Sequence, residues 1–267
     1  MGVSHPAQGM RDTHKQENEV EQKDTITQDQ PAPAWINQLH QVDASDFVRE
    51  LPPNSIDMLL TDPPYCSGGL HIGARSKAPG SKYINSSTRE SYAEFDFDNM
   101  DQRSWQFWCQ GWLGGAFRAL KPGGLVVCFI DWRQLPALTD VIQAAGFRLQ
   151  GIAVWDKTTG RARPRNGGFK QQAEFIVWAC KGTLPQCDVY LPGVFQSRLQ
   201  FPKRHMTEKP LEMAREIVRL VPAGGTVLDL FSGSGTFLVA AKEAGLNWAG
   251  CELNPAYYET SQERLAA

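Results

Sequence analysis

The chain has no large excess of charge of either sign and no long hydrophobic run. Its 267 residues include 27 Lys and Arg against 29 Asp and Glu, a net charge of −2. Contact with a nucleic acid would therefore need a local basic patch, because the whole chain is not basic. No stretch approaches the ~18 apolar residues of a membrane span. The polar N-terminus also lacks the apolar region of a signal peptide.

The six cysteines lack the spacing of a metal site. No Cys-x-x-Cys pair and no Cys/His cluster is present, so we expect no bound metal. Cys128, Cys180 and Cys251 lie in apolar, strand-like runs and are expected to pack as small buried hydrophobic residues. Unpaired thiols and the missing signal region together predict a cytoplasmic protein.

Two parts of the chain differ in composition. Residues 1–34 are mostly polar and predict a disordered tail. Residues 35–267 alternate strand-like and helix-like stretches, which predicts one α/β domain with a doubly wound, mostly parallel sheet. The stretches at 148–157 and 173–182 are expected to form an antiparallel hairpin at the sheet edge. Long connections at about 66–100 and 157–170, and a shorter one at 183–204, predict inserted loops.

A glycine loop joins a strand to a helix in "LDLFSGSGTFLVAA". No lysine follows Gly235, so this is not a P-loop for phosphate, and Leu238 stands where a full dinucleotide motif has its third glycine. Glu252 ends the next strand, where nucleotide-binding folds hold ribose hydroxyls. Asp229 precedes the loop, which itself contains no basic residue. This pattern favours S-adenosylmethionine, a cation without phosphate; a plain turn with glycine as a packing spacer is the alternative.

A second motif, "TDPPY", ends a buried strand. Asp62 provides carboxylate oxygens and Pro63 provides a carbonyl, so the pair can accept both hydrogens of an exocyclic amine. Pro63 and Pro64 restrict the backbone and hold these acceptors in place. The ring of Tyr65 offers a face on which a base could stack. A simple turn at the end of the strand is the alternative.

The two motifs together resemble those of S-adenosylmethionine-dependent amino-methyltransferases of DNA. Because "TDPPY" precedes "LDLFSGSGT", the order resembles the permuted β group of adenine-N6 enzymes. "HMTEKP", "VDASDFVREL" and "CELNPAYYE" also resemble family stretches. The resemblance implies a circularly permuted class I methyltransferase fold with seven strands, Rossmann-like. It implies catalytic residues Asp62, Pro63, Pro64 and Tyr65. It implies these cofactor-binding residues: Asp43, Asp62, Thr207, Lys209, Asp229, Phe231, Ser232, Gly233, Ser234, Gly235, Thr236 and Glu252.

Permutation makes a geometric prediction. Residues 36–43 should lie beside the strand that ends at Glu252 and complete the cofactor wall.

The family often has His-Glu where this chain has Ala173 and Glu174.

Double-stranded DNA is the partner that the resemblance implies, in the nucleoid of a bacterium or of a phage-infected cell. A base must leave the duplex to reach such a site while phosphate contacts hold the strand. One basic stretch is expected to make these contacts, unless it is only a solvated loop: Lys157, Arg161, Arg163, Arg165 and Lys170. Residues 66–85 are expected to close over the extruded base. Relatives are often dimers, so a homodimer is an open alternative.

The residue at position 62 indicates which nitrogen atom of DNA is methylated. Cytosine-N4 members of the family mostly carry Ser-Pro-Pro-Tyr, so Asp62 favours N6 of adenine. Glutamine and RNA methyltransferases tend to carry Asn-Pro-Pro-Tyr in the unpermuted order, which disagrees with this chain. Cytosine-N4 methylation and an inactive DNA-binding protein are the alternatives.

Overall fold

The computed structural model describes residues 33–66, 100–158, 167–197 and 208–267. Contacts join Pro33–Ala267 into one compact unit. Residues 1–32, most of the segment 66–100 and the basic residues Arg161, Arg163 and Arg165 lie outside the described residues. Within the described residues, no helix combines the length and the apolar character needed to cross a membrane.

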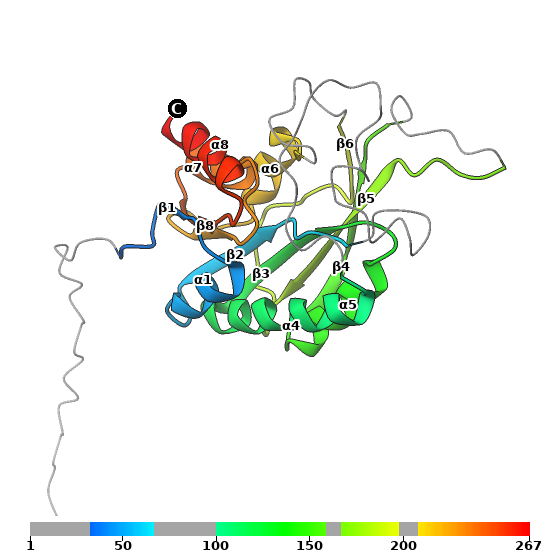
Figure 1. Cartoon of the computed structure of the whole chain (residues 1–267), viewed down its shortest axis with the longest axis horizontal. Helices are drawn as coiled ribbons and strands as arrows, with labels where there is room; N and C mark the ends of the chain where they lie inside the picture. The colour runs from blue at the N-terminus through cyan, green and yellow to red at the C-terminus, as the bar shows by residue number, and fades with distance from the viewer. Residues whose placement is uncertain (1–32, 67–99, 159–166, 198–207) are drawn as a thin grey trace, which may run out of the picture. The chain divides into compact units, whose positions relative to one another are not determined.

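A central sheet of eight strands organises the unit, in the order β1-β8-β7-β2-β3-β5-β4-β6 (Figure 1). The strands are β1 (Gln38–His40), β2 (Ile56–Thr61), β3 (Leu120–Ile130), β4 (Arg148–Asp156), β5 (Ala173–Cys180), β6 (Val194–Gln196), β7 (Thr226–Asp229) and β8 (Asn247–Cys251). Only β5 runs antiparallel to its neighbours, β3 and β4. The predicted doubly wound α/β fold is confirmed.

The strand count differs from the predicted seven. The eighth strand, β6, lies in the segment 183–204 that was predicted to be a loop, and it pairs in parallel with β4. It has only three residues and no apolar run, so the usual signal of a strand is missing. The antiparallel pair β4–β5 is present as predicted, but β6 lies beyond it and forms the edge of the sheet.

The permuted connection is confirmed by pairing at the other edge. β1 pairs in parallel with β8, with Leu39 beside Gly250 and His40 beside Cys251. The Glu252 amide then donates a hydrogen bond to the His40 carbonyl at 3.0 Å. The chain therefore begins its sheet beside the strand that it forms last, and the predicted neighbour of the Glu252 strand is present.

Helices cover both faces of the sheet. They are α1 (Ala44–Glu50), α4 (Gln102–Ala119), α5 (Leu135–Ala144), α6 (Leu211–Val218), α7 (Thr236–Glu243) and α8 (Pro255–Ala266). Residues of α1, α4 and α5 belong to one hydrophobic cluster, and residues of α6, α7 and α8 belong to a second. Each cluster also contains alternate side chains of the same strands, such as Leu59 in the first and Met58 and Leu60 in the second. The sheet is therefore buried on both sides, as parallel sheets are.

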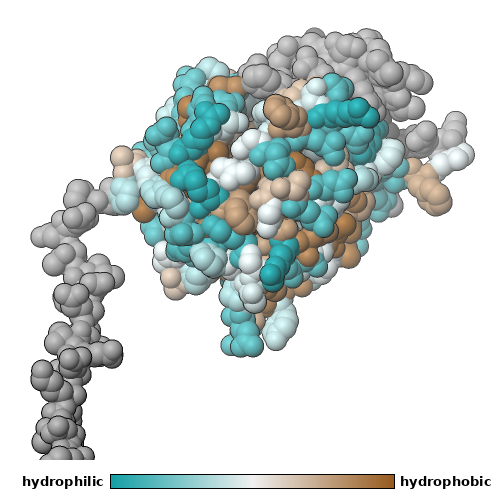
Figure 2. Space-filling view, turned by 90° about the horizontal axis from the view of Figure 1, so that it is seen from below, coloured by the Kyte–Doolittle hydropathy of each residue, from teal (hydrophilic) through white to brown (hydrophobic). Residues whose placement is uncertain are grey.

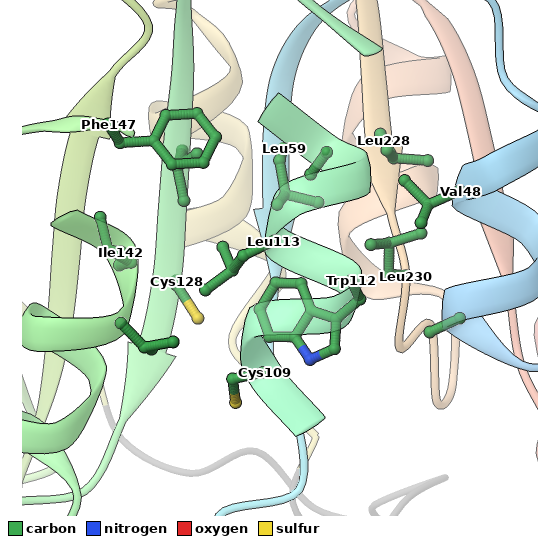
Figure 3. Close-up of a cluster of buried hydrophobic side chains, with 14 of the residues drawn as sticks. Val48, Leu59, Cys109, Trp112, Leu113, Cys128, Ile142, Phe147, Leu228 and Leu230 are labelled. Carbon is green, nitrogen blue, oxygen red and sulfur yellow. The ribbon is translucent and has the colours of Figure 1, made fainter. Parts of the chain in front are cut away.

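The longest helix, α4, shows how the sequence selects a buried face. Trp105, Cys109, Trp112 and Ala116 are buried and recur at intervals of four, three and four residues, which places them on one side of a helix. Asp101 accepts hydrogen bonds from the amides at positions 103 and 104 and caps the helix N-terminus. Figure 3 shows Trp112 between strand and helix side chains.

On the face in Figure 2, hydrophilic residues are mixed with hydrophobic ones.

Gly235 lies where the chain turns from the glycine loop into α7. Its φ of +78° favours glycine, and an added Cβ would lie 2.3 Å from the Ser261 Oγ on α8. Gly245 has a similar φ of +68°, but an added Cβ there would meet nothing within 4 Å. Alanine substitutions at the two positions therefore separate the free-energy cost of the backbone conformation from that of the steric clash.

We expect Gly245→Ala to lower the free energy of unfolding by about 1–2 kcal/mol, the usual cost of a left-handed residue. Gly235→Ala should lower it by a further ~1–3 kcal/mol, because the new methyl group overpacks the contact with α8. Urea unfolding of both variants measures the difference. Adding Ser261→Ala to Gly235→Ala should recover part of the loss. Equal losses at the two glycines would show that the contact with Ser261 does not constrain the loop.

Candidate active site

The two predicted motifs meet at the carboxyl ends of adjacent strands. β2 and β7 pair in parallel, with Leu59 beside Leu228. Beyond this pairing, the Thr61 Oγ1 donates a hydrogen bond to the Asp229 Oδ1 at 2.8 Å, and the Phe231 amide donates to the same oxygen at 3.1 Å. These two bonds tie the start of the Asp-Pro-Pro-Tyr segment to the start of the glycine loop. The switch point of the sheet therefore lies between them.

The Asp-Pro-Pro-Tyr segment is also held from α4. The Trp105 Nε1 donates a hydrogen bond to the Pro64 carbonyl at 2.8 Å. The Tyr65 hydroxyl donates to the Asp62 Oδ1 at 2.5 Å and lies 3.4 Å from the Glu174 Oε2. Backbone restriction by the prolines and these side-chain contacts hold the Asp62 carboxylate in one position.

The glycine loop is held from two sides. On one side, the Gly233 amide donates to the Glu252 Oε2 at 2.8 Å, and the Asn254 amide donates to the Glu252 Oε1 at 2.9 Å. On the other side, Arg264 of α8 donates to the Ser234 carbonyl at 2.6 Å and pairs with Glu208 at 3.1 Å. Glu252 is thus fixed at the end of β8 with its carboxylate beside the loop.

One cavity is lined by both motifs and by the ends of β1 and β8. Twelve of the predicted site residues line it: Asp43, Asp62, Pro63, Pro64, Tyr65, Lys209, Phe231, Ser232, Gly233, Ser234, Thr236 and Glu252. Asp43 reaches the cavity as the N-cap of α1, where it accepts from the Ser45 amide at 2.8 Å. The structure therefore brings together residues from both ends of the chain.

Several predicted site residues lie elsewhere. Asp229 and Gly235 do not line the cavity: Asp229 is buried between the strands, and Gly235 faces α8. Lys157 directly follows β4, where its ammonium pairs with Glu174 and its side chain is 24% exposed. Lys170 is exposed, and Thr207 lies outside the described residues.

Ten residues that line the cavity were not among the predicted site residues. They are Val42, Ala44, Trp108, Glu174, Glu208, Leu230, Phe237, Leu253, Asn254 and Tyr257. Glu174 had one available signal, since it is a lone carboxylate in the apolar strand "AEFIVWAC". The apolar residues had none, because a side chain that lines a cavity has the same pattern as one that fills a core.

Charged groups make the cavity acidic. Five carboxylates line it, from Asp43, Asp62, Glu174, Glu208 and Glu252, against the one lysine of the described lining, Lys209. Such a lining suits a cationic ligand and disfavours a phosphate. The donor set therefore fits S-adenosylmethionine, which carries a sulfonium and an ammonium group. Trp108 and Phe231 add aromatic surface, with ring centroids 5.3 Å apart.

Burial changes the ionisation of the groups around Asp62. It raises the pKa of Asp62, an effect that the nearby Lys209 opposes. Burial, followed by the charges of Asp62 and Glu174, holds the pKa of Tyr65 well above its usual value, so the phenol stays neutral. Burial also pushes the pKa of Glu174 upward, but Lys209 and Lys157 outweigh it and leave that pKa below its usual value.

A fold with this sheet order and a glycine loop beside an acidic cavity defines the class of Rossmann-like methyltransferases. The family model described as DNA methylase, for N6 and N4 enzymes, matches residues 56–263, and the chain belongs to this family. YubD of Escherichia coli (strain K12), a methylase by name, is 28% identical over 228 residues, which cover 85% of this chain and 89% of YubD. The Type II methyltransferase M2.DpnII of Streptococcus pneumoniae is 24% identical over 245 residues, 84% of this chain and 88% of that protein.

Solved structures share the fold. The complex of M1.HpyAVI with SAM has a TM-score of 0.63 at 22% identity and covers 86% of this chain and 99% of that one. The cytosine-N4-specific PvuII DNA methyltransferase has a TM-score of 0.67 at 18% identity, covering 85% of each chain. The chain is thus a DNA methyltransferase of the N6/N4 family, which uses S-adenosylmethionine.

The ionisation of Asp229 allows a test of the hydrogen bond between Thr61 at the end of β2 and Asp229 at the end of β7. Burial raises the pKa of Asp229 to about 8, above the value of ~3.9 in an unfolded chain. The folded state therefore binds an extra proton between these values, and the contribution of Asp229 to stability falls as the pH rises from about 4 to about 8. Asparagine can keep the Oδ1 acceptor for Thr61 and cannot ionise.

We therefore expect the stability of Asp229→Asn relative to the wild type to increase as the pH rises through this window. Chemical denaturation at pH 5 and pH 8 measures it, with the exposed Asp46→Asn as the control for a lost carboxylate. A pH-independent difference between Asp229→Asn and the wild type would mean that Asp229 is ionised in the folded protein.

Proposed function

We propose that this DNA methyltransferase transfers a methyl group from S-adenosylmethionine to N6 of an adenine extruded from double-stranded DNA. The observation that carries the proposal is the placement of Asp62 and Pro63 on the cavity that the glycine loop also lines. Asp62, in place of the Ser that most cytosine-N4 relatives carry, favours adenine. The likeness to the cytosine-N4-specific PvuII enzyme makes N4 of cytosine the second candidate.

The two acceptors have a direct chemical role. Asp62 and Pro63 can each accept one hydrogen of the exocyclic amine, which holds the nitrogen lone pair out of conjugation with the ring and directs it to one side. The ring of Tyr65 provides a stacking surface for the base, worth ~1–3 kcal/mol. Their main effect is to hold the amine in line for displacement. The raised pKa of Asp62 also suits it to take the proton that the methylated amine releases.

The cofactor would lie against the glycine loop. When bound, S-adenosylmethionine supplies an electrophilic methyl group on a positive sulfur. Glu252 faces this side of the cavity and, already held by two backbone amides, can bind ribose hydroxyls. Asp43 also lines the cavity, and we propose that it contacts the adenine moiety. The other carboxylates of the lining favour the positive charge of the cofactor.

We propose that DNA approaches the site from the side of the sheet where β2 and β7 end. We propose that the basic stretch 157–170 contacts phosphates and that residues 66–85 close over the extruded base; most of both segments lies outside the described residues. We also propose a cytoplasmic location, consistent with six cysteines that form no disulfide. A homodimer, as in related enzymes, is a further proposal that the solution mass would test.

The proposed reaction is tested with labelled cofactor and double-stranded DNA. We expect label on N6 of adenine, identified after enzymatic digestion of the DNA. Asp62→Ala should reduce transfer about 100-fold or more, since it removes a group that holds the reacting amine, and should affect cofactor binding much less than it affects transfer. The exposed Asp188→Ala is the control. Label on cytosine would select the N4 activity, and no label on any DNA would select a binding protein without catalysis.

The cofactor site is tested separately by calorimetry. We expect Glu252→Ala to weaken S-adenosylmethionine binding by about 10- to 100-fold, the range for losing hydrogen bonds to a charged group. Glu259→Ala, on the exposed side of α8, should bind normally. Normal binding by Glu252→Ala would place the cofactor elsewhere in the cavity.

A further inference from the structure

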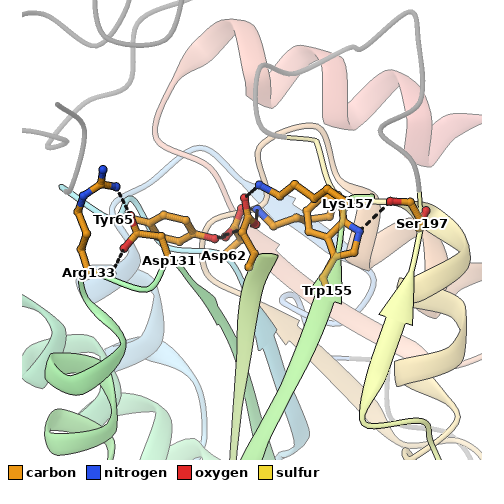
Figure 4. A network of polar contacts seen from close by, with 9 residues as sticks. Asp62, Tyr65, Asp131, Arg133, Trp155, Lys157 and Ser197 are labelled. Carbon is orange, nitrogen blue, oxygen red and sulfur yellow. Dashed lines mark hydrogen bonds and ion pairs between the residues drawn. The ribbon is translucent and has the colours of Figure 1, made fainter. Parts of the chain in front are cut away.

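A chain of ion pairs connects Asp62 through Lys209 and Glu174 to Lys157. The Lys209 ammonium pairs with Asp62 and lies 3.4 Å from the Glu174 Oε2, and the Lys157 ammonium pairs with the other oxygen of Glu174. Figure 4 shows the contacts from Tyr65 and Asp62 to Lys157. Two carboxylates and two ammonium groups thus alternate across β2, β5 and the segments that follow β4 and precede α6.

The charged side chains at the centre of these ion pairs are largely buried. The side chain of Lys209 is 3% exposed, and those of Asp62 and Glu174 are 15% and 14% exposed. Phe129 and Trp155 surround the same ammonium, with ring centroids at 5.5 and 6.0 Å. A charge in such surroundings is stable only with partners, and removal of one partner leaves the other uncompensated.

The position of Glu174 follows from the direction of β5. Because β5 runs antiparallel to β3 and β4, its first residues lie at the edge where the parallel strands end. Glu174 pairs in register with Trp155 near the end of β4, two residues before Lys157. The reversed strand therefore delivers a carboxylate to the catalytic edge from its beginning, whereas the other strands deliver theirs from their ends.

We propose that Lys209 and Glu174 are positioning residues that hold Asp62 as an ionised acceptor for the exocyclic amine of the target base. Lys209 stabilises the negative charge of the buried Asp62. Glu174 holds the ammonium in place and cancels its charge, so that the cavity stays favourable for a cationic methyl donor. The inference deepens the proposed function, because it assumes that Asp62 receives the amine.

The two residues should affect Asp62 in opposite directions. The charge of Lys209 lowers the pKa of Asp62, and the charge of Glu174 raises it. The other ionisable groups near Asp62 are Tyr65 in its own segment, Asp229 at the end of β7 and Cys128 on β3. These groups remain in both variants described below. If the pKa of Asp62 shifts in opposite directions in the two variants, the difference can therefore come only from the residue that each variant removes.

The experiment follows the titration of Asp62 directly. Protein with ¹³C-labelled aspartate carboxyl groups is titrated by NMR, and the Asp62 signal is assigned by its loss in Asp62→Asn. We expect the Asp62 midpoint to fall in Glu174→Gln and to rise in Lys209→Met, each by about one pH unit or more. The acid limb of the pH–rate profile for DNA methylation should move in the same directions.

Two other ion pairs provide controls. Glu243→Gln removes the partner of Arg215, and Lys121→Met removes the partner of Asp57; these pairs are substantially more exposed on at least one side. Neither should move the Asp62 midpoint. Glu174→Asp should restore part of the wild-type titration if the carboxylate, and not only the shape of the side chain, is required.

The outcomes separate this inference from the proposed function. An unchanged Asp62 midpoint in both variants, or shifts in the same direction, would overturn the positioning role. If Lys209→Met does not fold, Glu174→Gln decides alone: a midpoint that does not fall would overturn the inference. If the wild type methylates no DNA but the titrations shift as expected, the proposed function fails and the electrostatic role of the two residues stands.

Discussion

The site depends on one hydrogen bond between the ends of two neighbouring strands. Thr61 and Asp229 are separated by 168 residues in the chain, yet their side chains meet at 2.8 Å in the interior. Asp62 follows directly after Thr61, and Phe231 donates its amide to the same Asp229 oxygen. The bond therefore sets the distance between the acceptors for an amine and the loop for a methyl donor. Since displacement requires aligned reactants, a small change here would affect every later step.

Much of the architecture could be predicted from local patterns. The continuous apolar run before Asp62 predicted a buried parallel strand, and the glycine loop after Asp229 predicted a strand that turns into a helix. Parallel strands end at the same edge of a sheet. The motif order predicted the permuted neighbour of β8, which the pairing of β1 confirms. Each of these inferences needs only information that lies within a few residues, together with the general rules for α/β sheets.

The remaining features depend on contacts between distant residues. Lys209 was placed with the cofactor because it lies in a family motif, but its ammonium pairs with Asp62, 147 residues earlier. Lys157 belongs to a basic stretch, yet it pairs with Glu174. Gly235 was predicted to be part of a ligand loop, but a Cβ added there would clash with Ser261 of α8. Composition gives the charge of a residue but not the partner that compensates it after folding.

The identity of residue 62 is linked to this compensation. A serine at that position, as in most cytosine-N4 relatives, could accept a hydrogen bond without carrying a charge, and would leave Lys209 with Glu174 as its carboxylate partner. An aspartate adds a buried negative charge to a cavity that already holds four other carboxylates, and burial and the charge of Glu174 raise its pKa. Lys209 offsets that effect at the atom where the amine would bind. The aspartate form of the motif and the buried lysine therefore belong to one electrostatic unit, and exchanging Asp62 for Ser alone would leave the unit with an excess positive charge.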